Sequence, residues 1–159
     1  MPDMEKSEIL ERVKRATDSF TKSDLTLLDI DVNERSMTHR LAEHLQKEFP
    51  SEEWFVDCEY NRHFKRQKKL LKPPNLFSSD EHWRSLDAPT VYPDIIVHKR
   101  MTDEENLLVI EAKKSTSRVD DRWDRTKLAA FKEWPYSYQM AIFVRFKVGA
   151  DKGIDFEVV

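Results

Sequence analysis

The chain has 159 residues, a net charge of −3, and a composition that is 39% hydrophobic and 36% charged, which fits one domain with a single core. Cys58 is the only cysteine, which excludes an intrachain disulfide and a multi-cysteine zinc site, and the presence of only two glycines excludes a glycine-rich phosphate loop. The charged N-terminus has no signal-peptide pattern, and no apolar run is long enough to cross a membrane. We therefore expect a cytoplasmic protein without a membrane partner.

Two helices and a strand are expected in the first part of the chain. Apolar residues recur at helical spacing over 4–21, and a second helical pattern covers 32–48. The stretch between them, 24–30, is ambiguous. Residues 53–63 alternate between apolar and polar side chains, which is typical of a strand.

Residues 62–91 break this pattern and are interpreted as an insertion within one domain that covers 1–159. Pro73 and Pro74 exclude a regular strand there. On its own, the basic run at 62–72 is more typical of a solvated loop or hairpin end. Beside an acidic site it indicates an arm that binds nucleic acid. The cations of this arm are Arg62, Lys65, Arg66, Lys68, Lys69 and Lys72.

The second part of the chain alternates strands with one helix. Strands are expected at 92–99 and 106–113, joined by a short polar turn as an antiparallel hairpin. A helix over 118–134 and a strand over 136–147 follow, and the last residues, IDFEVV, can form a terminal strand. The order α-α-β-β-β-α-β-β predicts an α/β (α+β) fold in which helices flank a sheet.

Three charged residues lie in or beside the two apolar strands of the hairpin: Asp94, Glu111 and Lys113. A buried charge is costly unless it is paired or binds a metal. Side chains two apart share a face of a strand, so Glu111 and Lys113 point the same way, and antiparallel pairing brings Asp94 beside them. The two carboxylates and the carbonyl of Ala112 form an oxygen site suited to Mg²⁺ or Mn²⁺. Lys113 can orient the attacking water and stabilise negative charge, which favours phosphodiester hydrolysis.

The purely structural alternative is an ion pair of Lys113 with Asp94 or Glu111. An acid-x-Lys tripeptide alone is weak evidence, because chance produces several in a chain of this composition. This chain has one, and it stands at the end of an apolar strand. That placement favours a functional site.

Pro93-Asp94 followed by Glu111-x-Lys113 on the next strand resembles the signature of the PD-(D/E)XK nuclease superfamily, with its restriction-endonuclease-like fold. The stretch DVNERSMTHRLAEHL…VDCEYNR also resembles small, uncharacterised bacterial proteins of this class. The resemblance implies a mixed sheet flanked by helices in the order α-β-β-β-α-β, with Asp94 and Glu111 as metal ligands and Lys113 as the catalytic lysine. A homodimer is one of the states that it allows.

Two helical residues are further candidates. Glu34 falls near the centre of the apolar stripe of the second helix, where a carboxylate faces the sheet, and many members of the superfamily place a catalytic glutamate there. A capping box between Asp31 and Glu34 explains the same residue. Lys127 lies within the expected buried stripe of Trp123, Phe131 and Trp134, so its ammonium group either points to the site or snorkels to water.

The sequence therefore predicts a metal-dependent nuclease that acts on DNA. The alternative is a nuclease-like module without catalysis that binds nucleic acid or a partner protein. The acidic net charge and the insertion favour that alternative, whereas a purely structural subunit would leave the buried carboxylates unexplained.

Overall fold

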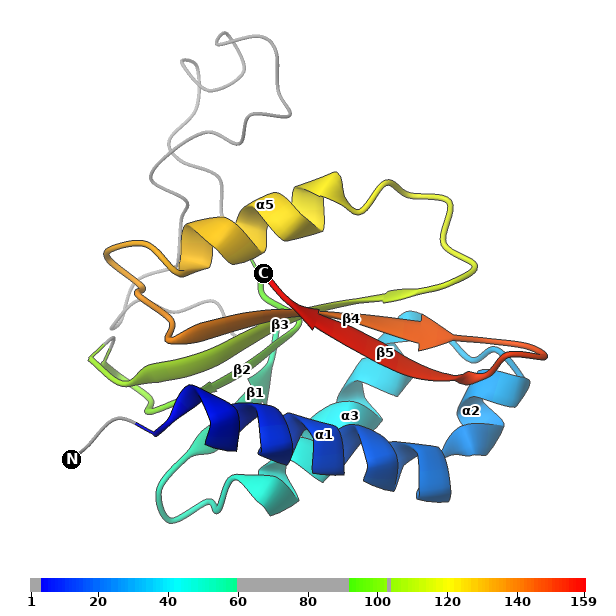
Figure 1. Cartoon of the computed structure of the whole chain (residues 1–159), viewed down its shortest axis with the longest axis horizontal. Coiled ribbons are helices and arrows are strands. Elements are labelled where there is room, and N and C mark those ends of the chain that lie inside the picture. The colour runs from blue at the N-terminus through cyan, green and yellow to red at the C-terminus, as the bar shows by residue number, and fades with distance from the viewer. Residues whose placement is uncertain (1–3, 60–91, 103) are drawn as a thin grey trace, which may run out of the picture.

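The computed structural model describes residues 4–59, 92–102 and 104–159, so the segment 62–91 lies outside the described residues. A single sheet stands between helices on both faces (Figure 1). The elements follow in the order α1 (Lys6–Ser23), α2 (Leu25–Asp29), α3 (Glu34–Glu48), β1 (Phe55–Cys58), β2 (Ile95–His98), β3 (Asn106–Lys114), α5 (Arg122–Phe131), β4 (Met140–Lys147) and β5 (Gly153–Val158).

The sheet has five strands in the spatial order β1-β2-β3-β4-β5 and is mixed. β1, β2 and β3 pair antiparallel, β3 and β4 pair parallel, and β5 returns antiparallel to β4. The predicted hairpin of β2 and β3 and the predicted mixed α/β (α+β) class are confirmed. The stretch 24–30, which is ambiguous in the sequence, contains the short helix α2.

β3 is the central strand, and all but the last of its residues are buried. Helices cover both of its faces, which explains why it reads as a nearly continuous apolar run rather than an alternating one. On one face α1 and α3 form the larger core with residues such as Phe20, Met37 and Ile110. On the other face α5 packs Leu128 and Phe131 against the sheet. The two faces of β3 therefore meet different helices (Figure 1).

The helical stripes of the first two long helices are confirmed. Ile9, Val13, Ala16 and Phe20 of α1 are 0–1% exposed. Their spacing of three and four residues places them on one side of the helix, as burial against a sheet requires. No helix within the described ranges has the length and apolar character needed to cross a membrane.

One alternative and one prediction are wrong. The capping box that was the alternative explanation of Glu34 is absent, because Asn33 caps α3 by accepting the N–H of Ser36 at 2.8 Å, while Asp31 adopts a left-handed φ of 52° in the preceding turn. Trp134 is 79% exposed rather than buried, because α5 ends at Phe131 and the following turn carries Trp134 away from the sheet.

Candidate active site at the end of the central strands

β3 is longer than its neighbour β2, and the candidate site lies where β2 ends. Ile95 and Ile110 form the last aligned pair, so β3 continues alone on this side to Lys114. Successive N–H groups on the β2 side of this extension, those of Ala112 and Lys114, have no strand to pair with. Two carboxylates accept them: Asp94 Oδ2 accepts the N–H of Ala112 at 2.8 Å, and Glu34 Oε2 accepts that of Lys114 at 3.1 Å.

This capping places Asp94 and Glu34 on the same edge of β3, although they are 60 residues apart in the chain. In an extended strand the N–H and C=O of one residue point to the same side. The carbonyl of Ala112 therefore points to the edge that carries both carboxylates. Two members of the predicted metal site, Asp94 and Ala112, therefore meet the separate candidate Glu34 at this edge.

Glu111 and Lys113 point from β3 to the face that α5 covers. They are 1% and 8% exposed, which agrees with the predicted shared face of residues two apart. Glu34 reaches the strand end from α3, on the opposite face of the sheet. Asp94, at the open edge of β3, lies between Glu34 on the α3 face and Glu111 on the α5 face.

The carboxyl groups of Asp94 and Glu111 are close enough that each affects the pKa of the other. Burial raises the pKa of Glu111 well above its ordinary value, and the charge of Asp94 raises it further. Burial also raises the pKa of Asp94, although the N–H of Ala112 and the contact with Glu111 oppose the shift. Two neighbouring carboxyl groups resist ionising together, because each negative charge disfavours the charged form of the other.

One oxygen of this pair has no hydrogen-bond donor. Ionised carboxylates only accept, and Oε1 of Glu111 is buried without a partner in the part of the chain that the structure describes. The other oxygen, Oε2, accepts from the ammonium group of Lys127 at 3.1 Å. A proton or a metal ion between Asp94 and Glu111 would satisfy Oε1.

Lys127 points into the site rather than to water. Its side chain is 12% exposed and bonds Glu111, so the site-facing interpretation of this lysine holds. Burial alone would lower the pKa of Lys127, but the charge and hydrogen bond of Glu111 outweigh it and raise the pKa above its ordinary value. The ammonium group is therefore firmly charged beside the carboxyl pair.

Lys113 has different partners from those expected. Its Nζ lies 2.5 Å from Oδ2 of Asp124 and 3.3 Å from the carbonyl oxygen of Asp120. A structural ion pair of Lys113 with Asp94 or Glu111 is therefore not formed, and Lys113 pairs with Asp124 of α5 instead. Sequence analysis missed Asp124, although it lies one helical turn before Lys127 and therefore on the same side of α5.

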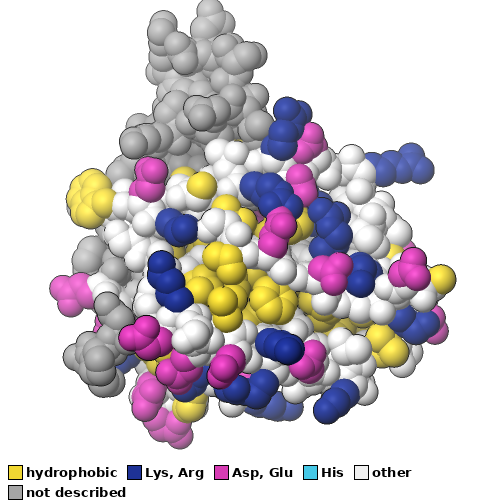
Figure 2. Space-filling view, viewed as in Figure 1, with side chains coloured by type: hydrophobic (Ala, Val, Ile, Leu, Met, Phe, Trp, Pro, Cys, Tyr) yellow, Lys and Arg dark blue, Asp and Glu magenta, His cyan; other side chains and the backbone are white. Residues whose placement is uncertain are grey.

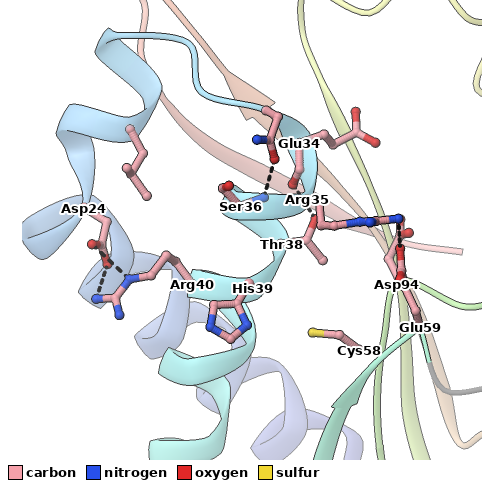
Figure 3. A pocket seen from close by; sticks show the side chains of 12 residues that line it. Asp24, Glu34, Arg35, Ser36, Thr38, His39, Arg40, Cys58, Glu59 and Asp94 are labelled. Atoms are coloured by element: carbon pink, nitrogen blue, oxygen red, sulfur yellow. Dashed lines mark hydrogen bonds and ion pairs between the residues drawn. The ribbon is translucent and has the colours of Figure 1, made fainter.

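A cavity of about 1040 Å³ opens beside Asp94 (Figure 3). Its walls come from α2, the start of α3 and the end of β1, and both Asp94 and Glu34 line it. Arg35 crosses its mouth and pairs with Glu59 at 3.1 Å. The cavity is large enough for a drug-sized ligand and reaches the strand-end carboxylates from the α3 face, whereas Glu111 and the two lysines lie under α5.

Among residues 4–59, 92–102 and 104–159, no group of three or more His, Cys, Asp or Glu side chains is arranged to hold a metal ion. The predicted oxygen site has two carboxylates and a main-chain carbonyl, so it depends on fewer side chains than such a group. Its chemistry suits a hard divalent cation, which accepts carbonyl and water oxygens as its other ligands.

The cations of the predicted basic arm lie outside the described residues: Arg62, Lys65, Arg66, Lys68, Lys69 and Lys72. On the face shown in Figure 2, described Lys, Arg, Asp and Glu side chains are intermixed around an apolar area. A mixture of both signs creates little net attraction for a polyanion. The described surface in this view therefore adds no support for DNA binding, and the arm remains the candidate for it.

Comparison with known proteins yields no family model, no curated protein and no solved structure that matches this chain. The resemblance to the PD-(D/E)XK superfamily stays a prediction from the motif.

The raised pKa of Glu111 predicts how the metal-free protein responds to pH. Because the folded pKa lies above the ordinary value of 4.5, wild-type stability falls as the pH rises from that value through the folded pKa. Glu111→Gln removes this loss. In urea unfolding with a chelator, the stability of the variant relative to wild type should increase as the pH rises from about 4.5 through the folded pKa of Glu111.

The matched control is Glu53→Gln, which removes an exposed carboxylate. Its difference from wild type should stay constant over the same range. If the stability difference between Glu111→Gln and wild type did not change with pH, the raised pKa of Glu111 would be contradicted.

Proposed function

We propose that the chain is a metal-dependent nuclease of the PD-(D/E)XK class that hydrolyses phosphodiester bonds in DNA. One observation carries the proposal: the buried carboxyl group of Glu111 and the half-buried one of Asp94 lie close together at the end of β3, and Oε1 of Glu111 lacks a donor among the described residues. Such a pair is costly for the fold. A cation that binds to the pair would offset this unfavourable energy and could take part in the reaction.

Asp94, Glu111 and the carbonyl of Ala112 would hold Mg²⁺ or Mn²⁺, with Glu34 at the same edge of the strand. The bound ion supplies a Lewis acid for the phosphate and lowers the pKa of a water nucleophile. Lys127 holds Glu111 by a bond at 3.1 Å, so it orients that ligand. Lys113 lies on the same face and would offset the negative charge that develops on the phosphate.

The element order also supports this class. α3, β1, β2, β3, α5 and β4 follow one another, which agrees with the α-β-β-β-α-β order that the resemblance implies. Agreement in order is support by analogy, since one fold carries many functions. Only the chemical properties of the site residues can distinguish a catalytic domain from a binding module.

A second function has an observation in its favour. Lys113 pairs with Asp124, and Lys127 pairs with Glu111, so both lysines are satisfied without a substrate. A nuclease-like module that binds nucleic acid or a partner protein without catalysis would keep such a network for stability. Assays of Mg²⁺- and Mn²⁺-dependent cleavage on circular plasmid and single-stranded DNA separate the two functions.

The metal site is tested by removing both carboxylate charges. Asp94→Asn/Glu111→Gln should abolish Mn²⁺ binding in calorimetry, because uncharged amide oxygens are poor ligands for a hard cation. The control Asp155→Asn/Glu157→Gln makes the same charge change on β5, where the carboxylates pair with Lys147 and Arg125. Equal Mn²⁺ affinity in wild type and the Asp94/Glu111 variant would eliminate the proposed site.

Catalysis is tested at Lys113. Lys113→Ala should lower the cleavage rate by about 10²–10⁴-fold, the usual contribution of a group of this kind, while Mn²⁺ affinity stays close to wild type. Lys132→Ala, which removes an exposed lysine after α5, should cleave normally. A Lys113→Ala variant that loses thermal stability in a protein with no cleavage activity would favour the binding module.

The basic arm is tested by salt dependence. Neutralising Lys65, Arg66, Lys68 and Lys69 should weaken DNA binding and flatten its dependence on salt, because contacts to phosphate release counterions. The control neutralises four exposed lysines on α1 and α3: Lys6, Lys14, Lys22 and Lys47. If the arm variant kept wild-type affinity and salt slope, a contact with another protein would be the better assignment.

A further inference from the structure

Asp124 is the one acidic side chain on α5 that contacts both buried lysines. Its Oδ2 lies 2.5 Å from Nζ of Lys113 and its Oδ1 lies 3.7 Å from Nζ of Lys127. Its side chain is 13% exposed, so little water competes for it. A carboxylate in this position holds two ammonium groups at a defined place beneath the helix.

The two lysines have unequal need of Asp124. Lys127 already has Glu111 as an anion at 3.1 Å. Lys113 has Asp124 as its one salt-bridge partner in the described residues, and it donates to the main-chain carbonyl of Asp120, whose carboxylate also interacts with its charge. Removing the charge of Asp124 would leave a buried ammonium group without its salt bridge, which is unfavourable.

Without this salt bridge, the ammonium group of Lys113 could pair with the carboxyl groups of Glu111 and Asp94. Lys113 shares its strand face with Glu111, whose Oε1 has no donor among the described residues. An ammonium group that moved onto Glu111 would satisfy that oxygen and neutralise the pair. It would also occupy the place and the charge that a divalent cation uses.

We infer that Asp124 is a positioning residue that holds the ammonium group of Lys113 beside the Asp94–Glu111 pair and off it, and so keeps the pair open for a metal ion. The inference rests on the proposed function, since it assigns a role within the same site. In this role Asp124 acts through Lys113, with which it forms a salt bridge at 2.5 Å.

Asp124→Asn keeps the shape of the side chain and removes its charge. Mn²⁺ affinity, measured by calorimetry, should fall about tenfold or more, the effect of a nearby unit charge on a charged site. The value of kcat for DNA cleavage should fall about 100-fold, because Lys113 is displaced, while KM changes little. Asp124→Glu keeps the carboxylate and should retain most of the Mn²⁺ affinity.

A double variant distinguishes positioning from a structural role. In Asp124→Asn/Lys113→Ala no ammonium group remains to cover Glu111, so Mn²⁺ affinity should return to that of Lys113→Ala. A loss of packing in α5 would not be repaired by a second truncation. Asp121→Asn is the control on the same helix start, since Asp121 pairs with Arg145 and Arg125 instead, and it should bind Mn²⁺ and cleave DNA as wild type does.

The outcomes are separable. If wild type binds no Mn²⁺ and cleaves no DNA, the proposed function fails, and the role of Asp124 fails with it. If wild type is active and Asp124→Asn keeps its Mn²⁺ affinity and kcat, the inference alone is overturned. It is also overturned if the double variant binds Mn²⁺ as weakly as Asp124→Asn, because Asp124 would then act on the fold and not through Lys113.

Discussion

The site depends on one mismatch in strand length: β3 runs past the end of β2. Main-chain N–H groups on the exposed edge of β3 need acceptors, and a buried N–H without one costs as much as a lost hydrogen bond. Asp94 and Glu34 supply them to Ala112 and Lys114. The capping of these N–H groups therefore brings two carboxylates to the end of β3 for reasons of local structure.

Both faces of the sheet contribute to this strand end, which explains why the charges can be so close without being equivalent. Glu34 arrives from α3, and Glu111 points to α5. Asp94, before β2, lies between the two. Because layers of helix cover both faces, Glu111 is almost completely removed from water, and burial dominates its pKa.

The lysines limit the cost of that burial without cancelling it. Lys127 neutralises one oxygen of Glu111, and Asp124 draws Lys113 toward α5. A fully satisfied network would be explained by structure alone. Here an acceptor oxygen on Glu111 has no donor among the described residues, and a proton, a water molecule or a cation would satisfy it.

Periodicity alone determined a large part of this protein. The stripe of Ile9, Val13, Ala16 and Phe20 determined which side of α1 is buried, because a side-chain period of 3.6 is a local property of the chain. The continuous apolar runs around Asp94 and Glu111, joined by a short polar turn, determined the hairpin. The shared face of Glu111 and Lys113 follows from the same rule.

Partners across the fold were decided by tertiary structure. No local pattern states that Lys113 pairs with Asp124 or that Glu34 caps the N–H of Lys114, since each contact depends on how α3 and α5 dock on the sheet. The exposed Trp134 shows the same limit: a helical stripe predicts burial only as far as the helix continues, and the turn after Phe131 ends it.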